Sequence, residues 1–204
     1  ACTDLRHDEW GIDVTISGSQ KGMMLPPGLS FTAISDKALA ATKTAKLPRS
    51  YFSWDDMISN NANGFFPYTP ATGLLYGLAE AIDMINEEGL ENVFTRHERL
   101  AEATRRAVKG WGLDIQCRDP KYYSPAVTTV VMPDGHNADA FRKLVLDTFN
   151  MSLGTGLNKI AGKVFRIGHL GDTNELTVMG ALTGVEMGLE IAGVPHKKGG
   201  VAAA

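Results

Sequence analysis

A lysine at position 21 lies in the stretch Ser17-Gly-Ser-Gln-Lys-Gly-Met-Met-Leu-Pro-Pro-Gly28, directly after a strand-like segment. A lysine amine attacks a carbonyl only when it is neutral. Apolar surroundings lower the pKa of the amine, so a larger fraction of it is neutral at a given pH. Ser19 and Gln20 could donate hydrogen bonds to a phosphate, and small neighbours leave room for a planar ring. The cluster is compatible with a nucleophilic lysine beside a phosphate, although a surface lysine in a turn is the commoner explanation of such a residue.

The segments around this lysine predict the elements that position it. Alternating apolar residues predict strands over 13–17 and 29–35. Thr69 followed by Pro70 predicts a helix start, with Thr69 as the N-cap and proline at the first helical position. The apolar stripe that follows recurs at helical spacing and stops at Gly89.

The second half of the chain predicts a smaller α+β unit. After Gly89 a second helix is expected through Val93, Leu100, Ala107 and Val108, ending in the glycines around Trp111. The later elements, in chain order, are a strand over 127–132, a helix capped by Asn137, a strand over 164–170 and a helix opened by Asp172 with Glu175. This order predicts an α/β chain in which the end of a large domain is joined by a long helix to a small α+β domain.

Composition limits the classes of function. The 204 residues carry 20 basic and 23 acidic side chains, so the formal charge is −3, and a nucleic-acid partner is not expected. No apolar run approaches the roughly 20 residues that span a bilayer, so no membrane partner is expected either. Cys2 and Cys117 form no CxxC pair, which argues against a zinc site and favours a reducing, cytoplasmic location.

Several other residues attract attention, but the sequence assigns them no chemistry. Gly154-Thr-Gly156 lacks the third glycine of a dinucleotide fingerprint, and the five histidines are too scattered to indicate a metal. Arg105 and Arg106 are expected on a solvated helix face, and His169 is expected to be a hydrogen-bonded strand histidine. Cys117 has no basic neighbour except Arg118 to stabilise a thiolate.

Several long segments in order resemble the class V aminotransferases, a branch of the fold-type I pyridoxal-phosphate (PLP) enzymes. They cover nearly the whole chain: DEWGIDVTISGSQKGMMLPPGL, NGFFPYTPATGLLYGLAEA, EEGLENVFTRHERLAEATRRAV, GKVFRIGHLGDTNELTVMGALTG and GVAAA. Within the family they are more similar to the members that transfer the amino group of serine to glyoxylate than to those that use alanine. The resemblance therefore implies a transaminase with PLP as cofactor and small amino acids and 2-oxo acids as substrates.

The resemblance also implies roles for particular residues that would hold the cofactor. Lys21 matches the lysine that binds PLP covalently and then moves the substrate Cα proton. Gln20 matches a contact to the cofactor phosphate, and Thr69 matches a phosphate ligand given by the other subunit of a homodimer. Phe66 stands where the alanine-using members have a phosphate-binding tyrosine, and Tyr68 is the candidate replacement.

Arg166 matches the arginine that binds the substrate carboxylate, a role suited to a planar guanidinium. On the residues themselves, a structural ion pair is the simpler explanation of a strand arginine. The resemblance divides the chain into the end of the PLP-binding large domain with its connector helix, residues 1–88, and a small C-terminal domain, residues 89–204. The aspartate that pairs with the pyridine nitrogen, the phosphate loop and the ring-stacking aromatic match no residue here, so the chain is expected to be the C-terminal half of a longer enzyme and inactive by itself.

Three alternatives remain open at the level of sequence. Alanine–glyoxylate transamination would use the same residues, and only donor kinetics would separate it from the use of serine. A cysteine desulfurase of the same superfamily would need a mobile, reactive cysteine, which Cys117 does not resemble. A non-catalytic dimerisation or interaction module could keep the fold, although the presence of Lys21 and Arg166 argues against such decay.

Overall fold

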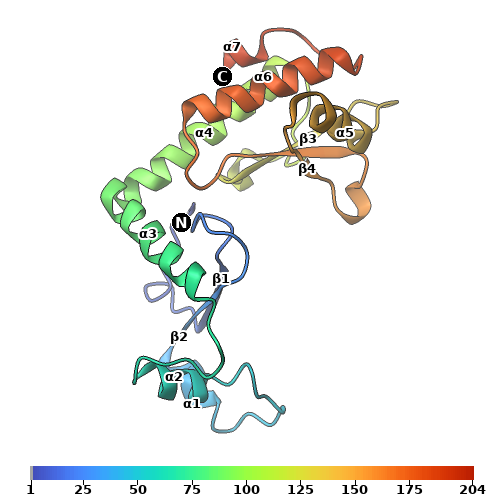
Figure 1. Ribbon diagram of the computed structural model, residues 1–204. Coiled ribbons are helices and arrows are strands. Elements are labelled where there is room, and N and C mark those ends of the chain that lie inside the picture. The colour runs from blue at the N-terminus through green and yellow to red at the C-terminus, as the bar shows by residue number, and fades with distance from the viewer. Residues whose placement is uncertain (1) are drawn as a thin grey trace. The chain divides into compact units, whose positions relative to one another are not determined.

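The computed structural model describes residues 2–204, which form two compact units. We call Asp4–Glu87 the Lys21 unit, and residues 2–3 together with 88–204 the Arg166 unit. Both contain helices and antiparallel strands, so the chain is mixed α/β (Figure 1). Within residues 2–204 we find no helix that combines the length and the apolar character needed to cross a bilayer.

A two-stranded antiparallel hairpin lies at the centre of the Lys21 unit. Strand β1 (Val14–Gly18) pairs with β2 (Ser30–Ile34) so that the end of β1 faces the start of β2. Both strands lie within one residue of the predicted ranges, because alternating β-branched residues mark them. The eleven residues between the strands, 19–29, form the loop that carries Lys21.

Three helices complete the Lys21 unit, and the sequence reasoning identified only the last. Helices α1 (Asp36–Ala41) and α2 (Trp54–Asn61) are short and contain no buried residue, so neither has the apolar stripe by which helices are recognised. Their signal is the N-cap: the Ser35 and Ser53 hydroxyls accept from backbone N–H groups in the first turn.

Helix α3 (Thr72–Glu88) ends where predicted, before Gly89, but the predicted start was wrong. The Ala71 carbonyl accepts the first helical hydrogen bonds, from the N–H groups of Leu74 and Leu75, so Thr69 and Pro70 precede the helix instead of opening it. The Thr69 hydroxyl is therefore not used as a cap, and the residue lies on the exposed segment that joins α2 to α3.

The Arg166 unit contains a three-stranded antiparallel sheet of order β3-β5-β4. Its elements, in chain order, are α4 (Leu90–Gly110), β3 (Val127–Val131), α5 (Ala138–Phe149), β4 (Gly154–Thr155), β5 (Val164–Gly168), α6 (Glu175–Ile191) and α7 (Gly200–Ala203), with single 3-10 turns at Pro120–Tyr122 and Asn158–Ile160. Figure 1 shows α4, α5 and α6 beside this sheet, and α7 next to α4 and α6. The long helices and the two longer strands lie where the sequence predicted them.

The core of this unit lies between the sheet and its helices. On β5, Phe165 and Ile167 point into the core and are almost fully buried, and they pair with Val130 and Thr128 of β3. Phe165 also packs against Phe141 of α5, with 4.9 Å between ring centroids. Since side chains alternate along a strand, the residue between Phe165 and Ile167 points to the opposite face of the sheet.

Two further sequence predictions are corrected here. The N-cap of α6 is Asn174, which forms a reciprocal capping box with Thr177, whereas Asp172 lies outside the helix. Arg105 was expected on a solvated face, but only 7% of its surface is exposed. It is ion-paired with Glu102 and its guanidinium lies 5.1 Å from the centre of the Tyr123 ring.

Candidate active site

The loop that presents Lys21 is organised around the buried hydroxyl of Ser19. This hydroxyl donates to the Pro26 carbonyl at 2.8 Å and accepts from the Leu29 backbone N–H at 3.1 Å. The Ser19 carbonyl accepts from the Leu25 N–H, so the two ends of the loop are tied together. Ser19 was a candidate phosphate donor in the sequence, but its side chain is already engaged in shaping the loop.

Lys21 and Gln20 both lie on the exposed side of this loop. The Lys21 carbonyl accepts from the Met24 N–H at 2.9 Å, closing a tight turn in which Met24 has φ +61°. The Gln20 amide folds back over Gly18, where an added Cβ would meet its Oε1 at 3.1 Å. Residues 2–204 therefore do not bury Lys21 as the sequence suggested. They do hold its backbone in a hydrogen-bonded turn.

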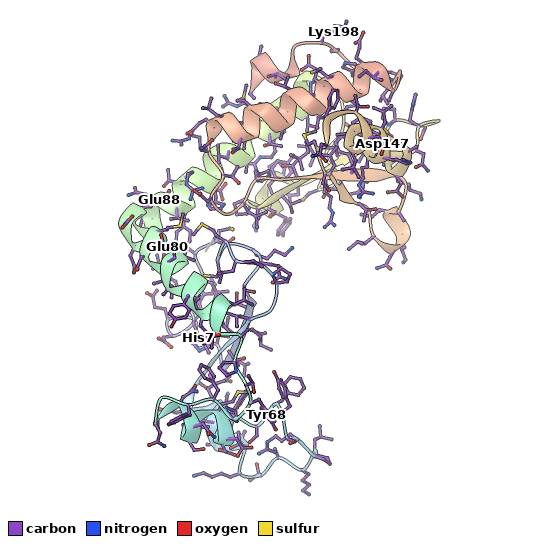
Figure 2. All side chains as sticks on the ribbon, in the orientation of Figure 1. His7, Tyr68, Glu80, Glu88, Asp147 and Lys198 are labelled. Carbon is purple, nitrogen blue, oxygen red and sulfur yellow. The ribbon has the colours of Figure 1, made fainter. Side chains whose placement is uncertain are left out.

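Thr69 and Tyr68 lie on the segment between α2 and α3, and both are exposed. Tyr68, labelled in Figure 2, packs its ring 4.8 Å from that of Tyr51, and its hydroxyl lies 3.3 Å from the Ser50 hydroxyl. Aromatic packing thus holds the Tyr68 hydroxyl close to the chain position of Thr69. The Lys21 unit therefore offers a primary amine, an amide and two hydroxyls.

Arg166 lies in the middle strand of the other unit, on the face of the sheet opposite the core. It pairs with Thr129 of β3 on one side and with Gly154 of β4 on the other. Its Nε is buried, and no acceptor among residues 2–204 bonds to it. A buried N–H without a partner is costly, so this group is suited to an acceptor from a bound molecule, such as a carboxylate oxygen.

His169 and Cys117, two other residues of the Arg166 unit, make contacts within the protein. His169 is fully buried, and both of its ring nitrogens are engaged, one with the Pro125 carbonyl and one with the Thr128 hydroxyl. Burial lowers the pKa of His169 to about 4, so this ring is neutral near pH 7. Cys117 is half-buried, and its thiol lies 3.5 Å from the Asp119 carbonyl. The prediction that His169 is hydrogen-bonded is confirmed, but His169 directly follows β5 instead of lying in the strand.

The family of the chain follows from its comparison with known proteins. Residues 3–166 match the model of the aminotransferase class-V family, so the chain belongs to that family, and the resemblance read from its segments is confirmed. The matched range contains both Lys21 and Arg166.

Several of the similar proteins are named as glyoxylate aminotransferases. The chain is 50% identical to the serine–glyoxylate aminotransferase of Hyphomicrobium methylovorum, over 96% of this chain and 49% of that protein. It is 46% identical to the L-aspartate–glyoxylate aminotransferase of Paracoccus denitrificans, over 98% of this chain and 51% of that protein. Among solved structures, the ureidoglycine–glyoxylate aminotransferase of Bacillus subtilis superposes with a TM-score of 0.91 at 28% identity, covering 98% of this chain and 53% of that one. The chain therefore spans about half the length of the relatives that it matches.

Proposed function

We propose that the complete protein is a PLP-dependent aminotransferase that moves the amino group of serine to glyoxylate, giving hydroxypyruvate and glycine. The observation that carries this proposal is the buried, unpartnered Nε of Arg166, a donor on the face of its sheet opposite the core. Serine is chosen as the donor because the Hyphomicrobium methylovorum relative is named for it and is 50% identical to this chain over 198 aligned residues.

The donor set of the Lys21 unit fits a phosphorylated aldehyde. The Lys21 amine would hold the aldehyde carbon, and Gln20 and Tyr68 would donate to a phosphate, whereas Thr69 would donate to the phosphate of the cofactor that the other subunit binds. When bound, PLP supplies an electron sink that weakens the bonds at the substrate Cα. The fixed turn at Lys21 supports its further role, because a general base must be held within reach of the proton that it takes.

Arg166 would bind the carboxylate of serine and then that of glyoxylate. A guanidinium donates from two parallel N–H groups to a carboxylate, and Nε can be one of these donors. Both substrates of the reaction carry a carboxylate, so the same arginine would orient the donor and the acceptor. This sharing suits an enzyme that handles the two substrates in turn.

We also propose that residues 1–88 belong to the large PLP-binding domain and residues 89–204 form the small domain, a division supported by the two compact units that meet at Glu87 and Glu88. The chain would be the C-terminal half of each subunit in a cytoplasmic homodimer. In that dimer, Thr69 would donate to the phosphate of the cofactor bound by the other subunit. Because the matched relatives are about twice as long, we expect the 204-residue chain by itself to be inactive.

Borohydride reduction followed by peptide mass spectrometry tests the role of Lys21. Reduction fixes PLP on the lysine that holds it, and trypsin does not cleave after a modified lysine. A tryptic peptide spanning residues 7–37 with one phosphopyridoxyl group should therefore appear, in place of separate peptides ending at Lys21 and Lys37. The Lys21→Arg protein should give no such adduct. Normal turnover by a Lys21→Ala enzyme would contradict the proposal.

A donor panel tests the choice of substrate. With glyoxylate as acceptor, kcat/KM is measured for serine, alanine and aspartate in the complete protein. The proposal expects serine to be preferred. A preference for aspartate would place the protein with its Paracoccus denitrificans relative, and a preference for alanine would favour the alternative donor considered from the sequence. No turnover and no PLP adduct would favour a non-catalytic module.

A further inference from the structure

Gly154 is the residue that lies directly against the side chain of Arg166. The two are register partners on the neighbouring strands β4 and β5. A Cβ at position 154 would lie 3.0 Å from the Arg166 Cβ and 3.2 Å from its Nε. The Arg166 side chain therefore runs across the bare backbone of Gly154, and a methyl group there would require the arginine side chain to shift by a few tenths of an ångström.

This glycine is not required by backbone conformation. The φ angle of Gly154 lies outside the left-handed region, so the pairing of β4 with β5 does not require a glycine at this position. An alanine at 154 could keep the strand conformation, so only the space occupied by Arg166 excludes it. In the sequence, Gly154 stands out only as part of Gly154-Thr-Gly156, which lacks the third glycine of a dinucleotide fingerprint, because no pattern along the chain reveals what lies on the next strand.

Helix α5 fastens the strand on both sides of Gly154. Arg142 donates from its Nε to the Leu153 carbonyl at 2.8 Å, and the Thr155 hydroxyl donates to an Asp139 carboxylate oxygen at 2.9 Å. The same carboxylate oxygen accepts from Arg142 at 2.9 Å, which joins the two fastenings. The residues on both sides of Gly154 are thus tied to α5, while Gly154 itself pairs with Arg166 of β5.

We propose that Gly154 is a positioning residue that directs the Arg166 guanidinium toward the substrate carboxylate, and that Asp139 and Arg142 hold it in place. The inference rests on the proposed role of Arg166. The Arg166 Nε, buried against Gly154 without a partner, can be oriented by shape only, since no protein acceptor among residues 2–204 fixes its direction. A flat neighbouring strand supplies that shape.

The test uses the complete protein and glycolate, which has the carboxylate of glyoxylate but no reactive carbonyl. In Gly154→Ala, the glycolate Kd measured by calorimetry should rise by about tenfold or more, as for a lost charge-assisted hydrogen bond. Gly180→Ala is the matched control, because position 180 has no heavy atom within 4 Å of an added Cβ, and its glycolate Kd should not change. Circular dichroism and PLP loading should be equal in both variants.

Kinetics separate positioning from a general loss of structure. Ethanolamine is serine without the carboxylate, so Gly154→Ala should lower kcat/KM for serine and leave that for ethanolamine nearly unchanged. In an Arg166→Ala background, Gly154→Ala should weaken glycolate binding no further, because the side chain that it displaces is gone. An equal loss for serine and ethanolamine, or a full additional loss in that background, would overturn the proposal.

Two outcomes distinguish this inference from the proposed function. If Arg166→Ala leaves the glycolate Kd unchanged, the proposed role of Arg166 fails and the inference fails with it. If Arg166→Ala weakens binding but Gly154→Ala does not, the function stands and only the inference is wrong. Should Gly154→Ala not fold, Arg142→Gln decides: it should raise the glycolate Kd by about threefold, and an unchanged Kd would overturn the proposal.

Discussion

The strongest prediction about stability concerns the buried imidazole of His169. Its Nδ1 lies 3.0 Å from the Pro125 carbonyl, which can only accept, so Nδ1 carries the proton of the neutral ring. Its Nε2 lies 2.9 Å from the Thr128 hydroxyl, which donates to it. Burial is the largest cause that lowers the pKa of His169 to about 4, and the positive charge of Arg105 adds to it. In the unfolded chain this pKa returns to about 6.5.

The sign of the pH dependence follows from these two pKa values. Between pH 6.5 and 4 the unfolded chain binds a proton at His169 that the folded chain does not, so stability falls as the pH falls through this window. Each pH unit within the window is worth about 1.4 kcal/mol. From about pH 7.5 to about pH 5, the free energy of unfolding should therefore fall by about 2 kcal/mol because of this group.

Urea unfolding of the parent and of His169→Gln, followed by circular dichroism, measures this effect. Glutamine keeps a donor and an acceptor but does not titrate. With a slope of about 2 kcal/mol/M, the parent midpoint should fall by about 1 M relative to the variant between about pH 7.5 and pH 5. His136→Gln, at a partly exposed turn, is the control and should follow the parent. Parallel curves for the parent and His169→Gln would refute the reasoning.

Three further substitutions test the packing of the Arg166 unit. In Gly200→Ala, the new Cβ would meet the buried Trp111 ring at 2.3 Å, so we expect α7 to undock and the unfolding free energy to fall by about 1–3 kcal/mol in denaturant titrations. Gly180→Ala, inside α6 with open space around it, should instead raise the thermal midpoint, in line with a gain of about 0.5–1 kcal/mol. Asn137→Ala removes the side chain that accepts two backbone N–H groups at the start of α5, and chemical denaturation should show a loss of about 1 kcal/mol. An unchanged midpoint for Gly200→Ala or Asn137→Ala would contradict the contact described for that residue. An unchanged midpoint for Gly180→Ala would contradict the open space around position 180.

Local rules account for most of the elements that were predicted. The strand around Val14, the long helix that ends before Gly89 and the α5 cap at Asn137 are encoded by residues within one turn or one strand of each other. The Lys21 segment and the Arg166 strand were found in the same way, because the matching motifs are continuous in the chain. The family was therefore determined by the sequence itself.

Tertiary structure decided what distant segments do to each other. The burial of Arg105 depends on Tyr123, eighteen residues later, whose ring lies against the guanidinium. Ser19 became a loop-organising residue because Pro26 and Leu29 return to it.

The same division explains the candidate site. Sequence reasoning could place Arg166 on a strand and could supply the carboxylate as its expected partner. It could not show that Gly154, twelve residues earlier, forms the surface along which the arginine runs. Motifs record which groups are present, whereas the direction of a side chain is set by the strand beside it, and that neighbour is chosen only when the sheet assembles.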